Sequence, residues 1–438
     1  MLSLFHYLKP NRMDILKLNS NRKRILILGC GFAGLSFTKH FRDKSCEILV
    51  IDKHNYFTFQ PLLYQVATGG LEPDSVAYPI RKLFSGINPV SFRMAEAYSV
   101  DLEKKLLITS IGELPYDVLI IATGSTTNYF NLPGIEEFAL PMKTLPQSLD
   151  LRSFILQSFE KALLAESPDE KLPYLNFVIA GGGPTGIEIA GALAEFKHVL
   201  PGDYPELDFS LMRIAIVEAS GEILGSMSEE SRLSASRQLT EIGVELILNS
   251  KIASYDGNVI SLVEGNKINS KCLIWTAGVK ANPLNGLSND AYTLAGKIKT
   301  DEFNRVIGCE DVYALGDVCQ IYRSDSEIRY PMLAPVAIQQ GKNLARNLMS
   351  NIRDEWKAFE YKDRGTMATI GRSKAVADLG RYKLKGFLAW LAWLFIHLIL
   401  LVGYRNRIVV LINWMWNYFS YDRAIRLIIR PFIPKKNE

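Results

Sequence analysis

The sequence is poor in the residues that build disulfide-bonded or metal-held scaffolds. Its 438 residues include only five cysteines and five histidines, and the cysteines, at positions 30, 46, 272, 309 and 319, form no closely spaced pair. An odd number of widely separated cysteines argues against a disulfide framework and against a zinc site. We therefore expect buried, unpaired thiols and no bound metal.

An excess of charge of one sign is also missing. The formal net charge is +4 and charged residues make up 22% of the chain, which gives no reason to expect a nucleic-acid partner. The hydrophobic fraction of 48% is ordinary for a globular protein, and the length allows two or three domains. The first residues contain no long apolar run, so no secretory signal is expected.

Two glycine-rich turns dominate what the sequence does contain. The first follows the short apolar run Arg24–Leu28 and places Gly29, Gly31 and Gly34 ahead of a helix-like segment. Such a turn lets a pyrophosphate approach the backbone at the N-terminus of the helix. The next apolar run, "CEILVID", ends at Asp52, where a carboxylate can bind ribose hydroxyls. Strand, turn, helix and acid together predict a dinucleotide site.

The second turn repeats this arrangement later in the chain. The apolar run Phe177–Ala180 leads into Gly181, Gly183 and Gly186, and the following strand-like run, "MRIAIVEAS", contains an acid, Glu218, near its end. Glu218 would repel a 2′-phosphate, and no arginine follows it closely, which favours NADH over NADPH.

The repetition extends beyond the glycines. The segments "YDVLIIATGS" (116–125) and "KCLIWTAGV" (271–279) are apolar strands that end in turns of small residues, each at a similar place after its own glycine-rich turn. A later strand, "DVYALGD" (311–317), matches the start of neither copy. Two copies of one βαβ-based unit explain the pattern. Two nucleotide sites in one chain suggest hydride transfer between two bound cofactors.

Taken in order, these motifs resemble those of flavoproteins with two dinucleotide-binding domains. The segments "HNYFTFQPLLYQVATGG" (54–70), "GGGPTGIEIAGALAE" (181–195) and "PVAIQQGKNLARNL" (335–348) are similar to the type II NADH:quinone oxidoreductases. These are single-subunit respiratory dehydrogenases that do not pump protons. The resemblance covers nearly the whole chain and implies an α/β fold of the glutathione-reductase type, with two Rossmann-like domains, C-terminal membrane-associated helices, bound FAD, and NADH as substrate.

The resemblance also implies which residues surround FAD. They are Gly29, Gly31, Phe32, Ala33, Gly34, Asp52, Lys53, Asn55, Gln60, Pro61, Thr123, Gly124, Gly316, Asp317 and Ala337. In the family, the segment that contains Asn55, Gln60 and Pro61 approaches the isoalloxazine. Asp317 is expected to hydrogen-bond the ribityl or pyrophosphate part of the cofactor.

For NADH, the resemblance implies that the three glycines of the second turn cradle the pyrophosphate and that Glu218 binds the adenosine ribose. Ala277 and Gly278 would leave room for the nicotinamide to lie flat on the flavin. Glu188 matches the family glutamate near the nicotinamide, although acids also favour the first turn of a helix on electrostatic grounds alone.

The expected quinone site departs from the family pattern at one position. Pro335 stands where the family commonly has a glutamine that could donate to a quinone carbonyl, whereas Gln339 and Gln340 remain. Lys374 is a further candidate, although a solvated lysine is an equally good interpretation. The predicted catalytic residues are Glu188, Gln339, Gln340 and Lys374. The predicted acceptor is a membrane quinone, ubiquinone or menaquinone.

Cysteine content separates this hypothesis from other enzymes of the same fold. Disulfide reductases need a redox-active cysteine pair beside the flavin, and sulfide:quinone reductases need cysteines to carry sulfur. Residues 54–70, where the first group would carry its pair, contain none. A non-quinone acceptor such as ferredoxin or oxygen stays an alternative, as does a nucleotide-binding membrane protein without turnover.

The C-terminal segment is rich in tryptophan and arginine. Phe387–Gly403 has no charged residue apart from a histidine, and as a helix it would span ~25 Å, against ~30 Å for a hydrocarbon core. Arg405 and Arg407 then interrupt, and the next stretch is amphipathic. Its polar face carries Asn413, Asn417 and Ser420, and Arg423, Arg426 and Arg430 follow. We expect an in-plane membrane anchor, with a membrane span or a dimer interface as alternatives.

These inferences predict three parts: a discontinuous FAD-binding domain (22–145 and 290–385), an inserted NADH-binding domain (146–289) and a membrane-anchoring module (386–438). The segment "SPDEKLPY" (167–174) is expected to be a turn-rich lead into the inserted domain. The predicted enzyme passes a hydride from NADH to FAD and two electrons to quinone. The sequence shows no chain of carboxylates within a membrane segment, so proton pumping is not expected. The resemblance places it at the cytoplasmic face of the bacterial inner membrane, and a homodimer is left open.

Overall fold

The computed structural model describes residues 22–87, 89–323, 326–350, 352–420, 426–428 and 431–432. These residues form two compact units, and each is described by itself. Unit 1 comprises the described residues up to Phe57 together with Pro79–Thr126 and Lys280–Lys362. Unit 2 comprises Thr58–Tyr78, Thr127–Val279 and the described residues from Asp363 onward. Compactness does not show which nucleotide a unit binds, so the domain assignment made from the sequence stays a prediction.

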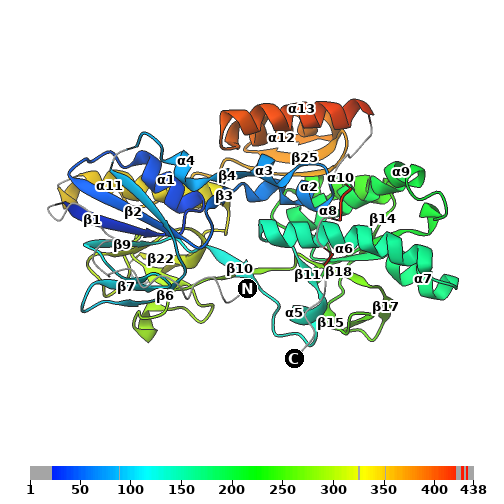
Figure 1. The fold of residues 1–438 in the computed structure, drawn as a ribbon, viewed down its shortest axis with the longest axis horizontal. Coiled ribbons are helices and arrows are strands. Elements are labelled where there is room, and N and C mark those ends of the chain that lie inside the picture. The colour runs from blue at the N-terminus through cyan, green and yellow to red at the C-terminus, as the bar shows by residue number, and fades with distance from the viewer. Residues whose placement is uncertain are drawn as a thin grey trace. The chain divides into compact units, whose positions relative to one another are not determined.

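A five-stranded parallel sheet forms the centre of unit 1, with the strand order β21-β9-β1-β2-β5 (Figure 1). The strands are β1 (Lys23–Leu28), β2 (Cys46–Asp52), β5 (Val90–Met94), β9 (Val118–Ile121) and β21 (Val312–Ala314). Both faces of this sheet are covered. Its strands are therefore continuous aliphatic runs rather than alternating ones, as the sequence indicated.

Two helices and a small sheet cover the central sheet of unit 1. Helix α1 (Phe32–His40) lies beside α11 (Ala334–Met349), so close that a Cβ on Gly341 would meet the carbonyl oxygen of Ala33 at 2.4 Å. An antiparallel sheet of β6 (Ala97–Asp101), β7 (Leu106–Thr109) and β8 (Gly112–Pro115) packs against the sheet through a common hydrophobic core. A third sheet contains β20 (Ile298–Thr300), β22 (Cys319–Arg323) and β23 (Ser326–Ile328).

Unit 2 repeats this arrangement. Its parallel sheet has the order β11-β18-β12-β13-β14, with β11 (Leu140–Pro141), β12 (Asn176–Ala180), β13 (Arg213–Val217), β14 (Val244–Ile247) and β18 (Cys272–Trp275). An antiparallel sheet of β15 (Ile252–Tyr255), β16 (Val259–Leu262) and β17 (Lys267–Asn269) shares one core with it. The main helices are α6 (Leu145–Leu164), α8 (Pro184–Ala194) and α10 (Glu229–Glu241). The duplication predicted from the sequence thus includes the antiparallel insertions, which the sequence did not reveal.

The segment 167–174, expected to be a turn-rich lead, forms instead helix α7 (Pro168–Leu175). The Ser167 side chain caps it by accepting a hydrogen bond from the Glu170 backbone nitrogen at 3.3 Å. Pro168 occupies the first helical turn, where a missing N–H leaves no bond unmade. Ser167 and Pro168, which suggested a loop, are therefore residues of a capped helix start, whereas Pro173 lies inside the helix near its end.

Shorter elements complete the two units. They are α4 (Ile80–Leu83), α5 (Ile135–Phe138), α9 (Phe196–Val199), β3 (Tyr56–Thr58), β4 (Ala77–Pro79), β10 (Ser125–Thr127) and β19 (Val279–Ala281).

The last part of unit 2 is an antiparallel sheet followed by two helices. The sheet contains β24 (Thr366–Gly371), β25 (Lys374–Leu379) and β26 (Tyr382–Lys385), and the helices are α12 (Gly386–Leu400) and α13 (Tyr404–Ser420). The expected helix over Phe387–Gly403 ends earlier, because the chain turns at Gly403 with φ 91°. Arg405 and Arg407 consequently lie inside α13. In the described part of the chain, no helix is both long enough and apolar enough to cross a membrane.

Helix α13 turns its polar side inward. The Asn406 side-chain amide donates to the carbonyl oxygens of Asp74, Ser75 and Ala77 at 2.9–3.1 Å. Further along, Asn413 donates to Glu72, and Asn417 donates to the Gly70 carbonyl. These partners lie in and around α2 (Leu63–Ala67) and α3 (Pro73–Val76).

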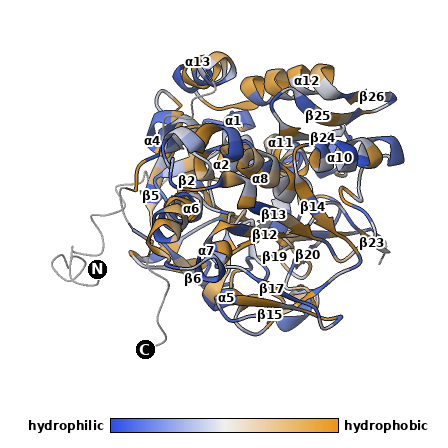
Figure 2. Ribbon diagram, turned by 90° about the vertical axis from the view of Figure 1, so that its right-hand side faces the viewer, coloured by the Kyte–Doolittle hydropathy of each residue, from blue (hydrophilic) through white to orange (hydrophobic). Residues whose placement is uncertain are grey.

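Large apolar side chains dominate the exposed surface of α12 and α13, which also includes Arg405 and Arg407, and Figure 2 shows α12 coloured as hydrophobic along most of its length. The exposed large apolar residues are Phe387, Leu388, Leu391, Phe395, Ile399, Leu400, Tyr404, Ile408, Leu411, Ile412, Met415, Trp416 and Phe419. The expected amphipathic character of α13 is therefore present but inverted relative to a helix on the surface of a protein in water.

The arginines that follow α13 were expected to meet lipid headgroups. Arg426 pairs instead with Asp203 of the same unit. Arg423 and Arg430 lie outside the described residues.

Candidate cofactor and substrate sites

The first glycine-rich turn has the geometry of a phosphate cradle. Gly29 has φ 101°, and a Cβ there would meet the Ala122 carbonyl oxygen at 2.3 Å. A Cβ on Gly34 would meet the Gly29 carbonyl oxygen at 2.0 Å, whereas one on Gly31 would have no heavy atom within 4 Å. Packing therefore requires the first and third glycines, while the second borders open space at the N-terminus of α1. Backbone N–H groups and the helix dipole favour an anion there.

The second turn has nearly the same geometry. Gly181 also has φ 101°, and its Cβ would lie 2.8 Å from the Cα of Ala277. A Cβ on Gly186 would meet the Gly181 carbonyl oxygen at 2.0 Å, and Gly183 again has no heavy atom within 4 Å. Unit 2 therefore carries a second cradle, at the N-terminus of α8.

The two predicted ribose-binding acids take matching positions. Asp52 accepts hydrogen bonds from the backbone nitrogens of Cys30 (2.7 Å) and His54 (2.8 Å). Glu218 accepts them from Gly182 (2.6 Å) and Ser220 (2.8 Å). Each carboxylate thus stabilises its own turn, and each still has lone pairs with which to accept from ribose hydroxyls.

Other predicted FAD residues in unit 1 also fit a bound ligand. The Thr123 hydroxyl is buried and has no hydrogen-bond partner among the described residues, which is uncommon unless a ligand supplies one. Gly124 has φ 70°. Asp317 accepts a hydrogen bond from the Ser125 hydroxyl, which holds its carboxylate in place. An open cradle, an acid and an unpaired hydroxyl in one unit are compatible with FAD.

The remaining predicted FAD residues are more scattered. Phe32 packs edge-on against Phe57 with ring centroids 5.3 Å apart. A Cβ on Gly316 would lie 3.4 Å from that of Ala337 and 3.5 Å from that of Ala33, so these small residues are closely packed. Lys53 and Asn55 are exposed members of unit 1, whereas Gln60 and Pro61 begin a short 3₁₀ turn that belongs to unit 2.

The two glutamines predicted to contact quinone are engaged inside unit 1. Gln340 is buried and accepts from the Gly316 backbone nitrogen at 2.6 Å. Gln339 both donates to and accepts from the backbone of Lys362, at 3.0 Å in each direction. Pro335 lies in the first turn of α11, where a backbone N–H would find no acceptor within the helix, so the proline loses no helical hydrogen bond. A role for either glutamine toward quinone stays a prediction.

At the predicted nicotinamide end, side-chain size is tightly limited. Ala277 lies against Gly181, as described above. A Cβ on Gly278 would meet the Phe130 ring at 2.8 Å. Packing against the Ala277 backbone therefore limits the residue at position 181, whereas the half-exposed Phe130 ring could move aside for a side chain at position 278.

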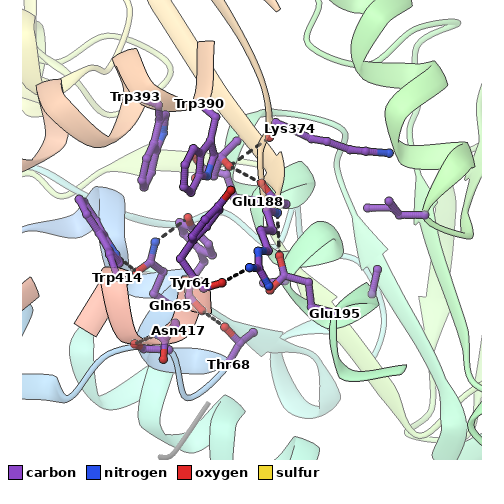
Figure 3. A pocket seen from close by; sticks show the side chains of 18 of the residues that line it. Tyr64, Gln65, Thr68, Glu188, Glu195, Lys374, Trp390, Trp393, Trp414 and Asn417 are labelled. Carbon is purple, nitrogen blue, oxygen red and sulfur yellow. Dashed lines mark hydrogen bonds between the residues drawn. The ribbon is translucent and has the colours of Figure 1, made fainter. Parts of the chain in front are cut away.

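Unit 2 also contains a cavity of approximately 470 Å³ (Figure 3). It is lined by side chains from α2, α8, β24, α12 and α13, and more of its lining surface is apolar than polar. Two predicted site residues, Glu188 and Lys374, line it. The other main lining residues were not predicted from the sequence; they are Tyr64, Gln65, Arg372, Trp390, Trp393, Trp414 and Tyr418.

Glu188 is the buried carboxyl of this cavity. Burial raises the pKa of Glu188 to about 8, against the opposing effects of the Thr369 backbone N–H and the nearby Trp393 indole. The carboxyl therefore holds its proton at pH 7. The other titratable side chains that line the cavity are Tyr64, Glu195, His198, Arg372, Lys374 and Tyr418.

Lys374 belongs to the same cavity but is directed elsewhere. Figure 3 shows its side chain extending away from Trp390 and Trp393. Its Nζ lies 2.9 Å from the Glu241 carboxylate. Contact between Lys374 and a quinone stays a prediction.

A chain of hydrogen bonds organises one wall of the cavity. Trp414 donates from its indole nitrogen to the Gln65 side-chain oxygen at 2.8 Å, and Gln65 donates to the Tyr64 hydroxyl at 2.8 Å. This wall joins α13 to α2, which are more than 300 positions apart in the sequence. The tryptophans looked like an interfacial belt in the sequence. The spacing of Trp390 and Trp393, three residues apart on one helix, was the available signal that both face the same side.

All five cysteines are free thiols. Burial raises the pKa of Cys30, Cys272 and Cys319, so these sulfurs are poor nucleophiles. Neither unit contains the reactive pair that a disulfide reductase needs.

Comparison with known proteins decides the family. The family model of the pyridine nucleotide-disulphide oxidoreductases matches residues 23–341, and that of the NDH2 C-terminal domain matches residues 364–420. The chain is 32% identical over 420 residues to the type II NADH:quinone oxidoreductase Ndh of Mycobacterium tuberculosis, covering 92% of this chain and 89% of that protein. This chain belongs to the type II NADH:quinone oxidoreductases. It is therefore an FAD-dependent enzyme with NADH as its substrate.

A second relative and a solved structure agree with this family and fold. The chain is 31% identical over 438 residues to an internal alternative NAD(P)H-ubiquinone oxidoreductase A1 of Solanum tuberosum mitochondria, covering 91% of this chain and 86% of that one. The solved structure of NDH2 from Plasmodium falciparum in complex with NADH has the same fold, with a TM-score of 0.85 at 23% identity, covering 93% of this chain and 100% of that one. The predicted fold class of a type II NADH:quinone oxidoreductase is confirmed.

Proposed function

We propose that this chain oxidises NADH at the second glycine-rich turn and reduces a membrane quinone in the cavity of unit 2. When bound at the first turn, FAD supplies the redox chemistry by accepting a hydride from NADH and giving two electrons to the quinone. Family membership and the two matching cradles support this assignment. The cavity is the observation that supports the location of the quinone.

The residues of the chain bind, orient and protonate. Gly31 and Gly183 leave the backbone at the starts of α1 and α8 open to two pyrophosphates, and Asp52 and Glu218 would accept from the two riboses. The carboxylate of Glu218 disfavours a 2′-phosphate, which makes NADH the preferred donor.

The cavity suits a quinone for three reasons. Its volume lies in the range typical of small-molecule sites, and it is lined by aromatic side chains. Formation of a quinol requires protons as well as electrons, and Glu188 carries a proton at neutral pH in a largely apolar setting. Two helices that form the cavity, α12 and α13, also carry the exposed apolar surface, so a lipid-soluble substrate would reach the site beside the bilayer.

The activity is tested in two half-reactions under anaerobic conditions. NADH should bleach the yellow absorbance of the purified holoenzyme, and a short-chain quinone added afterwards should restore it. Ferredoxin is the matched alternative acceptor. Recovery of the colour with ferredoxin but not with quinone would replace the proposed acceptor, and a flavin that NADH leaves oxidised would overturn the whole assignment.

The inverted polarity of α13 supports attachment to a membrane surface. A helix with its amides bonded inward and its apolar side chains outward needs an apolar environment on the outer side. We place the chain at the cytoplasmic face of a bacterial inner membrane, lying in the plane of one leaflet, because NADH is present on that side.

Matched variants on the two faces of α13 test this attachment. In the full-length protein, replacing the outward-facing Ile408, Ile412 and Phe419 by serine should reduce co-flotation with phospholipid vesicles at least about tenfold, because less apolar surface is transferred from water. The melting temperature should change little. The inward variant Asn406→Ala should still float but melt at a lower temperature, since three buried or partly buried carbonyl groups lose their donor.

A homodimer formed through the same apolar face is the competing explanation. Light scattering of the detergent-free wild type at rising protein concentration would reveal it. A stable dimer that does not bind vesicles would contradict membrane attachment.

A further inference from the structure

The wall of the unit 2 cavity contains a polar hydrogen that the described residues do not use. Trp393 is 1% exposed and lines the cavity. Among the described residues, its indole nitrogen makes no hydrogen bond of standard geometry, although it lies close enough to Glu188 to lower the pKa of that carboxyl. Buried N–H groups without a partner are rare in native proteins, so this one calls for a ligand that accepts from it.

The surrounding rings fix the position of the indole. Trp393 stacks on His397, with ring centroids 4.0 Å apart and an angle of 22° between the ring planes. The rings of Trp393 and Tyr64 meet edge-on, with centroids 6.3 Å apart. The ring of Trp414 lies 5.7 Å away. His397 is in turn held by its Nδ1, 2.8 Å from the Trp393 carbonyl oxygen. Burial lowers the pKa of His397 to about 4, so the stacked imidazole is uncharged at neutral pH.

The neighbouring polar groups Trp414 and Glu188 leave the indole N–H of Trp393 available to a ligand. The indole N–H of Trp414 is already donated to the side-chain oxygen of Gln65. Figure 3 shows Trp393 and Trp390 directed from α12 toward the region of Glu188. A protonated Glu188 attracts the indole N–H less strongly than a carboxylate would.

We propose that the indole N–H of Trp393 positions the quinone by donating a hydrogen bond to one of its ring carbonyl oxygens. This inference rests on the proposed use of the cavity by quinone. A quinone ring is flat and apolar on both faces, and it carries carbonyl acceptors but no donor. A cavity of aromatic side chains with an unused donor matches that chemistry. A ligand without an acceptor at the ring edge would leave the N–H unpaired and bind more weakly.

The test removes the donor and keeps the ring. Trp393→Phe, and site-specific replacement of Trp393 by β-(3-benzothienyl)alanine, both lack the N–H, and the second retains the bicyclic shape if phenylalanine leaves a cavity that destabilises the fold. In the holoenzyme, both should raise the KM for a short-chain quinone about tenfold, which corresponds to about 1.4 kcal/mol. The kcat and the rate at which NADH bleaches the flavin should stay close to those of the wild type.

The matched control is the same benzothienyl replacement at Trp356, whose buried indole N–H also lacks a partner among the described residues but which does not line the cavity. The dissociation constant of the quinone for the oxidised enzyme, from equilibrium dialysis, should rise with KM at position 393 and change less than threefold at position 356. An unchanged KM for the benzothienyl variant at position 393, or equal changes at both positions, would overturn the assignment to Trp393. If the wild type fails to reduce quinone at all, the proposed function fails instead.

Discussion

The two glycine-rich turns have the same geometry, but different elements pack against the helices α1 and α8 that follow them. The first glycines, Gly29 and Gly181, share the same φ of 101°. The third glycines, Gly34 and Gly186, would each place a Cβ 2.0 Å from the carbonyl oxygen of the first. The acids bond to their turns at distances that agree within 0.1 Å. The chain therefore contains one nucleotide cradle twice.

The difference begins two residues after the third glycine. Ser36 in α1 and Glu188 in α8 hold this same position. The Ser36 hydroxyl donates to the Ile338 carbonyl of α11 at 2.7 Å, which ties two helices together. The Glu188 carboxyl instead reaches a cavity formed with the C-terminal helices. The two turns are thus alike, whereas the layers packed against the two helices differ: α11 in unit 1 and the C-terminal part of the chain in unit 2.

The strongest test of this comparison replaces the third glycine of each turn by alanine. Because the added Cβ would overlap backbone, each turn should open and lose its ligand. Gly34→Ala should lose most of its bound FAD, measured from the absorbance after desalting. Gly186→Ala should keep its colour but require on the order of 100-fold more NADH to bleach.

Gly202→Ala is the matched control, since a Cβ there has no heavy atom within 4 Å and φ is not positive. It should change neither property. Loss of FAD from Gly186→Ala with retention in Gly34→Ala would reverse the assignment of the two cradles.

The next test compares the two residues that follow the turns. Glu188→Gln keeps the shape and the hydrogen bonds of the side chain but cannot release a proton, so quinone reduction at pH 7 should fall on the order of 100-fold. Bleaching by NADH should be retained. Ser36→Ala should lower the free energy of unfolding by about 1 kcal/mol through one lost hydrogen bond and leave turnover unchanged. Equal turnover by Glu188→Gln and the wild type would remove Glu188 from the mechanism.

The wild type and Glu188→Gln should also differ in how the stability of the folded protein depends on pH. Burial raises the pKa of Glu188 from its ordinary 4.5 to about 8. Between these values the unfolded chain has released the proton while the folded chain still holds it, so the wild type loses stability as pH rises. Relative to the wild type, Glu188→Gln should gain in melting temperature from pH 5 to about 8, with no further gain above that. A constant difference across this range would show that Glu188 titrates normally.

The smallest expected effect concerns the two acids. Glu218→Gln removes the charge that disfavours a 2′-phosphate, so the ratio of kcat/KM for NADPH to that for NADH should rise about tenfold. Asp52→Asn alters the corresponding acid of the other turn. It should leave that ratio unchanged and weaken the retention of FAD. A rise of the ratio in Asp52→Asn would mean that the acids have the opposite roles.

Local sequence was sufficient for the parts of the structure that are locally determined. A buried aliphatic strand, a turn whose first and third positions exclude a Cβ, and a helix start lie within about a dozen residues, so both cradles could be predicted. Helix α7 was missed because its prolines suggested a loop, although Pro168 occupies the one turn of a helix that accepts it.

The cavity could not be predicted in the same way. Its wall brings Gln65 next to Trp414, and only the packing of α13 against α2 determines that contact. The family resemblance also implied a role for Gln340 toward quinone, which stays a prediction; in the structure its amide oxygen accepts from the Gly316 backbone nitrogen. A residue type that suits a ligand also suits an unpaired backbone N–H, and the sequence does not distinguish the two.

The inward amides of α13 have a practical consequence for protein engineering. Removing residues from 386 onward, to obtain a fragment that is easier to purify, would take away Trp393 and Trp414 and leave the carbonyl groups of Asp74, Ser75 and Ala77 without their Asn406 donor. The shortened chain would have an opened pocket and a frayed α3. Improved handling is better sought by polar substitution at the outward apolar positions other than Phe387 and Phe419, whose rings contact the cavity residues Trp390 and Tyr418.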